Sequence, residues 1–400
     1  MTFAGHARGS REYRRLIVGL FLAGIATFAQ LYSPQAVLPQ LAADLRVAPA
    51  TAALAVSAAT LGLAAAVIPW SIVADRIGRV PAMATGIVAA TILGIVAPFS
   101  GDVAVLLVLR VVEGAALGAV PAVALVYLSE EVERRHAAAA AGSYIAGTTV
   151  GGLLGRIVSG LVAEVLDWRA GMWAVALVCA VSAALFLWLA PRSRGFSPTG
   201  RERDRIRSRL LTALRSPAQL ALYAQGFLLM GAFVAVYNYL GFHLADAPFA
   251  LPAWLITLLF LAYLAGTASS PLAGALASAK GRYPVLWGSI AVMAGGAVLM
   301  LAPSGAVVLT GLLLFTAGFF GAHAVASGWT PVAAPSGSGS QASSLYYFAY
   351  YAGSSLFGWL LGLVFGQVGW TWFVLAIVAM CVVAAAVATG ALRAEPTGRV

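Results

Sequence analysis

The chain is built from long apolar runs that are separated by short polar breaks. Runs of twenty or more mostly apolar residues recur along its 400 residues, and about 20 such residues are enough for one helix to cross a bilayer. The pattern therefore predicts twelve membrane-spanning helices, six on each side of a long polar break. We place them at residues 15–39, 51–74, 81–100, 103–128, 137–163 and 169–190, and then at 217–243, 252–277, 284–303, 306–330, 340–366 and 370–392.

The composition indicates that lipid, rather than water, surrounds most of the chain. Hydrophobic residues make up 61% and charged residues only 10%, whereas a soluble domain carries about a quarter charged residues. A membrane β-barrel would show alternating segments of roughly ten residues, and the long unbroken runs favour helices instead. The expected fold class is an all-α membrane protein.

The basic residues are distributed unevenly between the two sets of loops. Twenty of the 24 Lys and Arg residues lie in the termini and in loops that should share one side of the membrane, and only Arg46 and Arg169 lie in the opposite loops. Basic residues concentrate on the cytoplasmic side of membrane proteins, so both termini are expected in the cytoplasm. This asymmetry accounts for the net charge of +10 without a nucleic-acid partner.

The long polar break divides the chain into two halves. We predict a cytoplasmic N-terminus, a six-helix bundle, an Arg-rich linker, a second six-helix bundle and a cytoplasmic C-terminus, at residues 1–14, 15–190, 191–216, 217–392 and 393–400. We interpret the linker as a solvated connection that also enforces topology; binding to lipid headgroups or to a partner is the alternative. Its part from Arg201 onward is expected to form an amphipathic helix.

The second half repeats the first. The stretch "SIVADRIGRVP" (71–81) returns as "GALASAKGRYP" (274–284), and "YIAGTTVGG" (144–152) returns as "YYAGSSLFG" (350–358). Self-similarity at about half the chain length indicates a duplicated unit. Because each half contains an even number of spans, the two halves should have the same orientation in the membrane.

Three of these stretches resemble motifs of the major facilitator superfamily. Residues 71–81 resemble its loop signature G-x-L-A-D-R-x-G-R, with Ser71 in place of the first Gly and with Ser278 at the acidic position of the second copy. "RVVEG" (110–114) resembles R-x-x-Q-G, and "GTTVGG" (147–152) resembles the antiporter motif G-P-x-x-G-G with Thr148 in place of Pro. The resemblance implies two parallel six-helix bundles and, within the superfamily, the bacterial drug/proton antiporter branch that includes arabinose-efflux-permease-like exporters.

The resemblance also implies a role for the loop, and the repeated stripe of small residues indicates one for the glycines. The loop would form a cytoplasmic gate, in which Asp75 accepts hydrogen bonds from a helix start in the other half; a plain positively charged turn is the alternative. The glycines would provide a moving surface between the halves, with static helix packing as the alternative. The gate comprises Asp75, Arg76, Gly78, Arg79, Gly281 and Arg282, and the interface glycines are Gly147, Gly151, Gly152, Gly155, Gly353 and Gly358.

Charged residues inside the spans are the candidates for proton coupling. Arg110 and Glu113 lie three residues apart, on one face of a helix, and should pair because an isolated charge in the bilayer is costly. We expect them to border the central cavity and Glu113 to exchange a proton; a buried pair that only fixes packing is the alternative. His323 is a second titratable candidate, with a packing role as its alternative. For Arg156 we expect either a pair with Asp167 or an extended side chain that reaches the outer interface.

The first span of each half should line the substrate cavity in this fold. The cavity candidates are Gln30, Tyr32, Gln35, Arg110, Tyr237, Asn238 and Tyr350. An aromatic wall around Tyr350 would suit a flat, amphipathic or cationic compound, although interfacial tyrosines give the same pattern. The first span contains no acidic residue, which leaves Glu113 as the leading proton carrier.

The function predicted from these features is secondary active transport. We expect proton-coupled efflux of small organic compounds or drugs by rocker-switch alternating access; a proton symporter or facilitator that imports a sugar, carboxylate or amino acid is the alternative. A membrane scaffold or intramembrane enzyme is disfavoured because no Walker loop, dinucleotide fingerprint, metal-ligand cluster or catalytic triad is present. We expect a functional monomer in the bacterial inner membrane, with substrate, protons and lipid as partners, and with the proton gradient rather than a cofactor or metal as its energy source.

Overall fold

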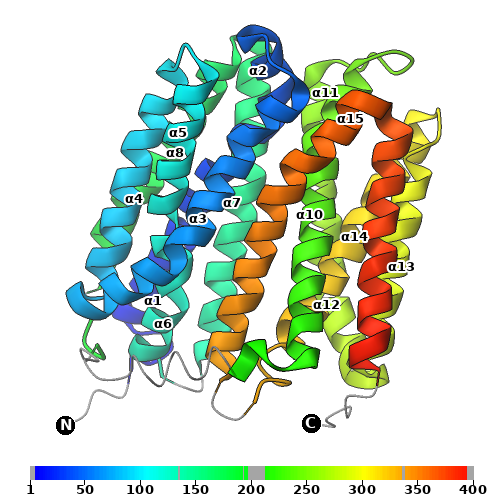
Figure 1. The fold of residues 1–400 in the computed structure, drawn as a ribbon. Helices are drawn as coiled ribbons and strands as arrows, with labels where there is room; N and C mark the ends of the chain where they lie inside the picture. The colour runs from blue at the N-terminus through cyan, green and yellow to red at the C-terminus, as the bar shows by residue number, and fades with distance from the viewer. Residues whose placement is uncertain (1–4, 134–135, 192, 197–211, 336–337, 394–400) are drawn as a thin grey trace. The chain divides into compact units, whose positions relative to one another are not determined.

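A computed structural model describes residues 5–133, 136–191, 193–196, 212–335 and 338–393. These residues are almost entirely helical (Figure 1), and the one β-bridge among them, between His6 and Val132, is isolated. Eleven helices in the described ranges are long and apolar enough to cross a membrane. The last of them contains non-helical backbone at Gly369 and is therefore two helices in sequence. The expected all-α membrane fold is confirmed.

The chain divides into two compact units. One consists of the described parts of residues 1–47 and 54–200, and the other of residues 48–53 with the described parts of 201–400. The division falls within the predicted linker 191–216. Residues 197–211 of that linker, and with them most of the predicted amphipathic helix, lie outside the described residues.

The helices of the first unit mostly match the predicted spans. They are α1 (Arg11–Tyr32), η1 (Gln35–Val37), α2 (Leu38–Leu45), α3 (Pro49–Ile77, whose first residues group with the second unit), α4 (Arg79–Val96), η2 (Ala97–Phe99), α5 (Val103–Leu117), α6 (Ala119–Glu131), α7 (Ala137–Val165) and α8 (Trp168–Leu189). The predicted first span is interrupted after Tyr32, and the fourth is interrupted at Gly118 between α5 and α6.

The second unit repeats this plan. Its helices are α10 (Pro217–Ala245), α11 (Ala253–Leu258), η4 (Leu259–Ala262), α12 (Tyr263–Lys280), α13 (Arg282–Leu299), α14 (Gly305–Trp329) and α15 (Gly339–Leu392). The predicted span at 252–277 is divided among α11, η4 and α12, and the spans at 340–366 and 370–392 both lie in α15.

The two copies of the loop motif adopt the same backbone conformation. Gly78 separates α3 from α4 with φ 97° and ψ 161°, and Gly281 separates α12 from α13 with φ 92° and ψ 154°. Only glycine adopts such angles without strain. Both glycines are followed at once by an arginine that begins the next helix, so the sequence repeat corresponds to a structural repeat.

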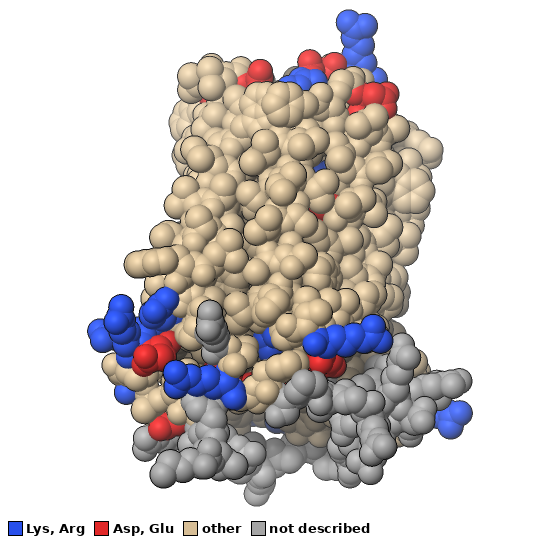
Figure 2. All heavy atoms as spheres, turned by 90° about the vertical axis from the view of Figure 1, so that its left-hand side faces the viewer, with Lys and Arg blue, Asp and Glu red and all other residues tan. Residues whose placement is uncertain are grey.

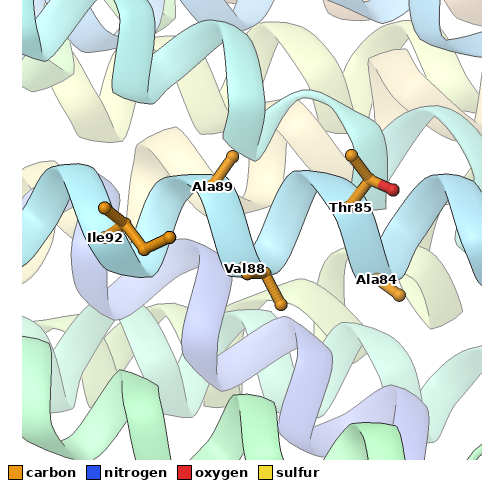
Figure 3. Close-up of a pocket in the computed structure, with 5 residues that line it drawn as sticks. All are labelled: Ala84, Thr85, Val88, Ala89 and Ile92. Atoms are coloured by element: carbon orange, nitrogen blue, oxygen red, sulfur yellow. The ribbon is translucent and has the colours of Figure 1, made fainter.

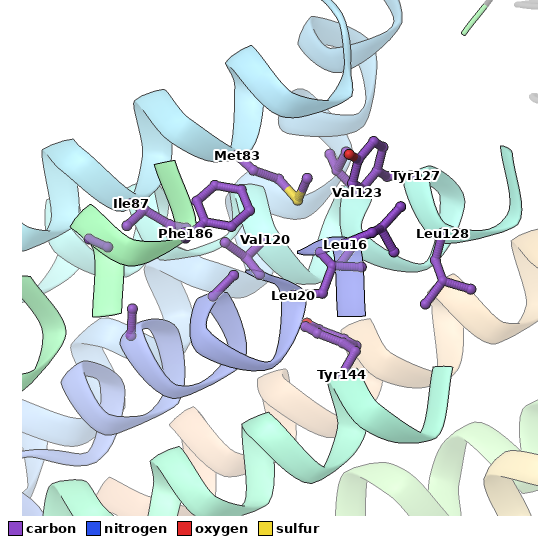
Figure 4. Packing of buried hydrophobic residues seen from close by; sticks show 14 of the residues in the cluster. Leu16, Leu20, Met83, Ile87, Val120, Val123, Tyr127, Leu128, Tyr144 and Phe186 are labelled. Atoms are coloured by element: carbon purple, nitrogen blue, oxygen red, sulfur yellow. The ribbon is translucent and has the colours of Figure 1, made fainter. Parts of the chain in front are cut away.

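The core of the first unit forms where α1, α4, α6, α7 and α8 meet. Apolar side chains from these helices pack together there (Figure 4), among them Leu16 and Leu20 of α1, Met83 of α4 and Phe186 of α8. The outer face of the unit is different, because a broad band of uncharged residues separates charged groups at its two ends (Figure 2). This band is the surface that a lipid bilayer would cover.

The glycine stripe of α7 contacts α1 within the same unit. A Cβ atom added at Gly147 would lie 2.2 Å from the carbonyl oxygen of Phe21, and one added at Gly155 would lie 2.3 Å from that of Ala29. Gly151 meets Ile25 in the same way, at 2.7 Å. Every fourth residue of one helix thus faces every fourth residue of the other, and the absence of side chains on α7 lets the two backbones touch.

The second unit contains the equivalent contact between α15 and α10. A Cβ atom at Gly353 would lie 2.0 Å from the carbonyl oxygen of Phe227, and these two residues follow Gly147 and Phe21 by the same 206 positions. The carbonyl of Gly358 accepts hydrogen bonds from Asn238 and Tyr239 of α10. In each unit the two helices are more than a hundred residues apart in the sequence, and they pack against each other through a glycine at the equivalent position.

The close neighbours of Gly147, Gly151, Gly155 and Gly353 lie in their own unit, and Gly152 faces Arg156 and Tyr32, which also belong to its unit. The glycines therefore pack helices within each unit. Their role in a moving surface between the halves stays a prediction.

Replacement of Gly155 by Ala should destabilise the protein, because the new methyl group would overlap the backbone of Ala29. Overpacking of this kind costs about 1–3 kcal/mol, so we expect a lower unfolding temperature in detergent. Gly142→Ala is the matched control: it lies on the same helix, and among the described residues no atom is within 4 Å of the added methyl group. Equal unfolding temperatures for the two variants would contradict this packing.

Candidate functional site

The site begins with the break in the first span. Pro34 follows α1 and has no backbone N–H, so it cannot donate the hydrogen bond that the carbonyl of Gln30 would otherwise accept. The backbone N–H and the hydroxyl of Ser33 both donate to that carbonyl, at 3.4 and 3.0 Å. Inside a membrane, carbonyls at a helix break need partners from the protein, and the neighbouring helices provide them.

Arg110 of α5 binds the end of α1. Its Nη2 donates to the carbonyl of Leu31 at 2.6 Å and its Nη1 to that of Gln30 at 3.2 Å, while Nε donates to the carbonyl of Ala55 in α3 at 2.8 Å. The side chain has no exposed area. A positive charge is favourable at the C-terminal end of a helix, so one guanidinium stabilises the break and ties three helices together.

Two glycines let α5 come close enough to α3 for this contact. A Cβ atom at Gly62 would lie 2.0 Å from the carbonyl oxygen of Val111, and one at Gly114 would lie 1.9 Å from that of Ala59. Gly114 was part of the recognised "RVVEG" pattern, but its role in packing was not predicted. The "RVVEG" motif therefore contains both Arg110 and the glycine that lets α5 approach α3 closely enough for Arg110 to bind there.

Glu113 completes the cluster. Its Oε2 accepts a hydrogen bond from Nη1 of Arg110 at 2.6 Å, and its side chain has no exposed area. Among the described residues its Oε1 has no hydrogen-bond partner, and neither does the side-chain amide of Gln30. That amide lies over Gly94 of α4, where a Cβ atom would be 1.8 Å from Nε2. The structure thus contains the predicted pair, beside a second polar group that is equally enclosed.

Arg110 and Glu113 are enclosed by helices of the first unit because the carbonyls at the break and in α3 surround the guanidinium. Within this unit the pair ties helices together. The expectation that it borders the central cavity stays a prediction.

Arg156 differs from both expectations. Its side chain is 1% exposed, so it does not reach the outer interface, and Asp167 instead caps α8 by accepting a hydrogen bond from the N–H of Ala170 at 2.8 Å. Nε of Arg156 donates to Oε1 of Gln35 at 2.6 Å, and the guanidinium lies over the ring of Tyr32, 4.1 Å from its centroid. Gln35 and Tyr32 were not predicted as partners of Arg156, because the break in the first span that brings them there was not predicted.

The candidates in the second unit form an aromatic cluster. The hydroxyls of Tyr237 and Thr316 are 2.7 Å apart, and the amide of Asn238 donates to the carbonyl of Gly358 at 3.3 Å. Nδ1 of His323 lies 2.9 Å from the hydroxyl of Tyr346, and the His323 ring lies 4.9 Å from that of Tyr350. Rings from α14 and α15 therefore pack around His323, the only histidine of α14.

The loop motif forms an ion-pair network at one end of the first unit. Nη1 of Arg79 lies 2.5 Å from the carboxylate of Asp75, and Nε and Nη2 bind the carboxylate of Glu130 at 3.1 and 2.8 Å. Arg76 is exposed. In the second copy the hydroxyl of Ser278 bonds back to the carbonyl of Gly274 at 3.1 Å. The predicted latch of Asp75 to the other half stays a prediction.

Two acidic residues at the end of α6 were not predicted as part of this network. Glu130 binds Arg79, and the buried carboxylate of Glu131 accepts hydrogen bonds from the backbone N–H groups of Arg194 and Gly195 at 2.6 and 2.8 Å. The sequence signal was an adjacent pair of acids at the end of a predicted span, close to a basic loop.

A groove on the surface of α4 is distinct from all these residues. It is lined by Ala84, Thr85, Val88, Ala89 and Ile92 (Figure 3). All five come from one helix, and Val88 and Ile92 are exposed. It contains none of the predicted site residues, and its apolar lining on the outer band suits contact with lipid tails.

The fold and the site together define a polytopic membrane protein whose polar chemistry is enclosed within helical bundles. Among the described residues no group of three or more His, Cys, Asp or Glu side chains could hold a metal ion. Broken spans and buried ionisable residues at mid-span depth are features of proteins that move solutes across membranes.

Comparison with known proteins identifies the family. The sequence profile of the Major Facilitator Superfamily matches residues 20–358. The chain is 38% identical over 382 residues to the inner membrane transport protein YnfM of Escherichia coli, which covers 96% of this chain and 91% of that protein. It is 35% identical over 377 residues to the uncharacterized MFS-type transporter YybF of Bacillus subtilis, which covers 94% and 93%. The chain belongs to the Major Facilitator Superfamily.

More distant comparisons agree with this assignment. The multidrug resistance protein MdtL of Escherichia coli is 26% identical over 349 residues, which is 86% of this chain and 88% of that protein. The structure of the nucleoside transporter NupG superposes with a TM-score of 0.77 at 14% identity, and it covers 94% of this chain and 100% of that one. The family and the fold are those of transporters, and the chain is a multi-pass inner-membrane protein.

Replacement of Arg110 by Met should strongly destabilise the protein. The change removes the guanidinium donors from the carboxylate of Glu113 and from three carbonyls, of which that of Gln30 keeps Ser33 as a donor. Breaking a buried ion pair costs about 3–5 kcal/mol. The double variant Arg110→Met with Glu113→Met should recover part of that loss, because no uncompensated buried charge remains. Unfolding temperatures of the wild type, both single variants and the double variant measure this coupling; purely additive effects would contradict it.

Proposed function

We propose that this protein exports small organic compounds by alternating access, driven by the proton gradient. The observation that carries the proposal is the carboxyl group of Glu113, which is fully buried in a membrane span and bonded through one oxygen to Arg110. A buried ionisable group at this depth is uncommon and is typically part of an ion or proton pathway.

The surroundings of Glu113 suit a group that gains and loses a proton. The guanidinium of Arg110 favours the carboxylate when it is close, and a separation of the two groups favours the protonated form. The amide of Gln30, which lies beside this carboxyl group, can serve either form, since it has a donor end for the carboxylate and an acceptor end for the carboxylic acid. A change in helix positions would therefore bind or release a proton here.

Two observations support export. The "GTTVGG" stretch resembles an antiporter motif, and the relative MdtL carries the name of a multidrug resistance protein. Import of a small metabolite by symport remains the competing function, and the direction of substrate movement relative to the proton gradient distinguishes the two.

The ion-pair network at the end of the first unit supports a gating role. Arg79 binds Asp75 and Glu130 at once, so it fixes the α3–α4 turn against the end of α6. A turn held this way can move as a rigid unit during the transport cycle. Because the loop motif has an acidic residue in its first copy and Ser278 at that position in the second, only the first unit would contribute a charged gate.

Substitution of Glu113 by Gln should abolish coupling to the proton gradient. The change keeps the shape and removes the titratable group, so we expect substrate transport in proteoliposomes to lose its response to an imposed pH gradient while exchange without a gradient persists. Glu164→Gln is the matched control, because Glu164 is an exposed residue near the end of α7. A drug-sensitivity screen of a deletion strain would provide the substrate.

Two results would overturn parts of this proposal. Wild-type gradient dependence in the Glu113→Gln variant would exclude this carboxyl group as the proton carrier. Substrate accumulation on the same side as the protons would replace export by symport and leave the family assignment intact.

We further infer that the termini face the cytoplasm, since 20 of the 24 basic residues lie in the segments assigned to that side. The test uses a chain in which the two buried cysteines, Cys179 and Cys381, are replaced by Ala. A new cysteine at the exposed Gly101 should react with an impermeant maleimide on intact cells, whereas one at the exposed Lys280 should react only after permeabilisation. The reverse pattern would invert the topology.

A further inference from the structure

We propose that the start of α1 and the end of α8 together bind the headgroup of an anionic phospholipid. The site, which we call the arginine patch, consists of Arg11, Arg14 and Arg15 of α1 and Trp188 of α8. All four residues belong to the first unit, and none of them is part of the proposed proton-coupling site. The inference therefore stands whether or not the protein exports compounds.

The three arginines lie on one face of α1 and have no acidic partner. Arg14 and Arg15 follow Arg11 by three and four positions, which places them side by side on a helix. Arg11 and Arg14 are exposed, and Arg15 is half-buried. Among the described residues none of the three forms an ion pair, not even with Glu12 of the same turn. Like charges at this spacing repel, and an anion bound between them would relieve that repulsion.

The guanidinium of Arg15 is held against the end of α8. Its Nη2 donates to the carbonyl of Trp188 at 2.7 Å, and its Nε donates to that of Leu189 at 3.2 Å. A guanidinium has five N–H donors, and the remaining donors of Arg15 have no partner among the described residues. Arginine binds phosphate through parallel hydrogen bonds, so this side chain presents fixed donors for a phosphate at the junction of the two helices.

Exposed apolar side chains adjoin the arginine patch. Val18 follows Arg14 by one turn on the same face of α1 and is 46% exposed, while the side chain of Trp188 is 71% exposed. Leu185 lies one turn before Trp188 in α8 and is also exposed. Basic side chains gather at the border of the broad uncharged band (Figure 2), which is where tryptophan and phospholipid headgroups meet in a membrane.

This combination of charge and apolar surface selects the kind of ligand. A compound bound at the patch would meet cations at one end and exposed apolar side chains directly beside them. A phospholipid matches both parts, since its phosphate faces the arginines and its acyl chains lie along the helices. A free phosphate or a nucleic acid would use the charge alone and leave the apolar surface uncovered.

The second unit shows that the helix does not need these arginines in order to form. At the offset of 206 positions that relates the two units, they are replaced by Pro217, Leu220 and Ala221. The helix α10 nevertheless forms and packs closely against α15. Basic residues also direct topology, but that role requires neither a shared helix face nor an adjoining exposed apolar surface.

The test measures lipid binding to the purified full-length protein in a neutral detergent. The protein is titrated with dioleoylphosphatidylglycerol, which is anionic, or with dioleoylphosphatidylcholine, which is zwitterionic, and native mass spectrometry counts the retained lipid. We expect the anionic lipid to bind in a saturable way, at least about tenfold more tightly than the zwitterionic one, and to raise the unfolding temperature. Inorganic phosphate and a single-stranded oligonucleotide should bind more weakly than the anionic lipid.

Replacement of both Arg11 and Arg14 by Gln should weaken binding of the anionic lipid by at least about tenfold, because each arginine near an anionic surface changes the affinity about fivefold. Both side chains are exposed and unpaired, so the lipid-free variant should unfold at the wild-type temperature. The single variants Arg11→Gln and Arg14→Gln should each weaken binding about fivefold, and they decide the question if the double variant folds poorly.

The matched control replaces Arg215 and Lys280 by Gln. Both residues are exposed and belong to the second unit, so the control removes the same charge away from the patch and should bind the anionic lipid as the wild type does. The inference is overturned if the two lipids bind equally well, if phosphate or the oligonucleotide binds as tightly as the anionic lipid, or if the Arg11 and Arg14 variants bind that lipid no more weakly than the control.

Discussion

The first unit depends on how the break in its first span is satisfied. A helix interrupted within a membrane exposes carbonyls that lipid cannot bind, and each unsatisfied group would cost several kcal/mol. Pro34 makes the interruption unavoidable, and Arg110 supplies three of the donors that stabilise it and the adjoining helix α3. The positions of α1, α3 and α5 follow from this one guanidinium, as does the burial of Glu113 that neutralises it.

The duplication has preserved packing more strictly than chemistry. The glycine turn between the second and third spans, and the contact of one glycine with one phenylalanine between the first and fifth spans, recur in both units with nearly the same geometry. The charged groups do not recur: Arg110, Glu113 and Arg156 have no counterpart at mid-span in the second unit, where Leu312 and Phe315 follow the first two by 202 positions. The second unit instead gathers aromatic rings around His323. The two halves thus share a scaffold and differ in their polar chemistry.

The sequence predicted the spans and the duplication well, because apolar length and repeated turn residues are local properties. It also predicted the Arg110–Glu113 pair, which follows from spacing on one helix. The partners of the glycine stripe could not be predicted, since small residues indicate close approach but not which helix approaches. The partners of Arg156 required knowledge that Pro34 breaks the first span, and that signal was present in "YSPQAVLP" (32–39). Glu130 was missed because its partner lies 51 residues away.

The direct contact between the backbones of α1 and α7 also has a mechanical consequence. Helices that touch without intervening side chains have no soft layer between them, and close-packed interiors are stiff. The two helices should therefore move together over the length from Gly147 to Gly155, and the break at Pro34 lies at the end of this jointly moving part of α1.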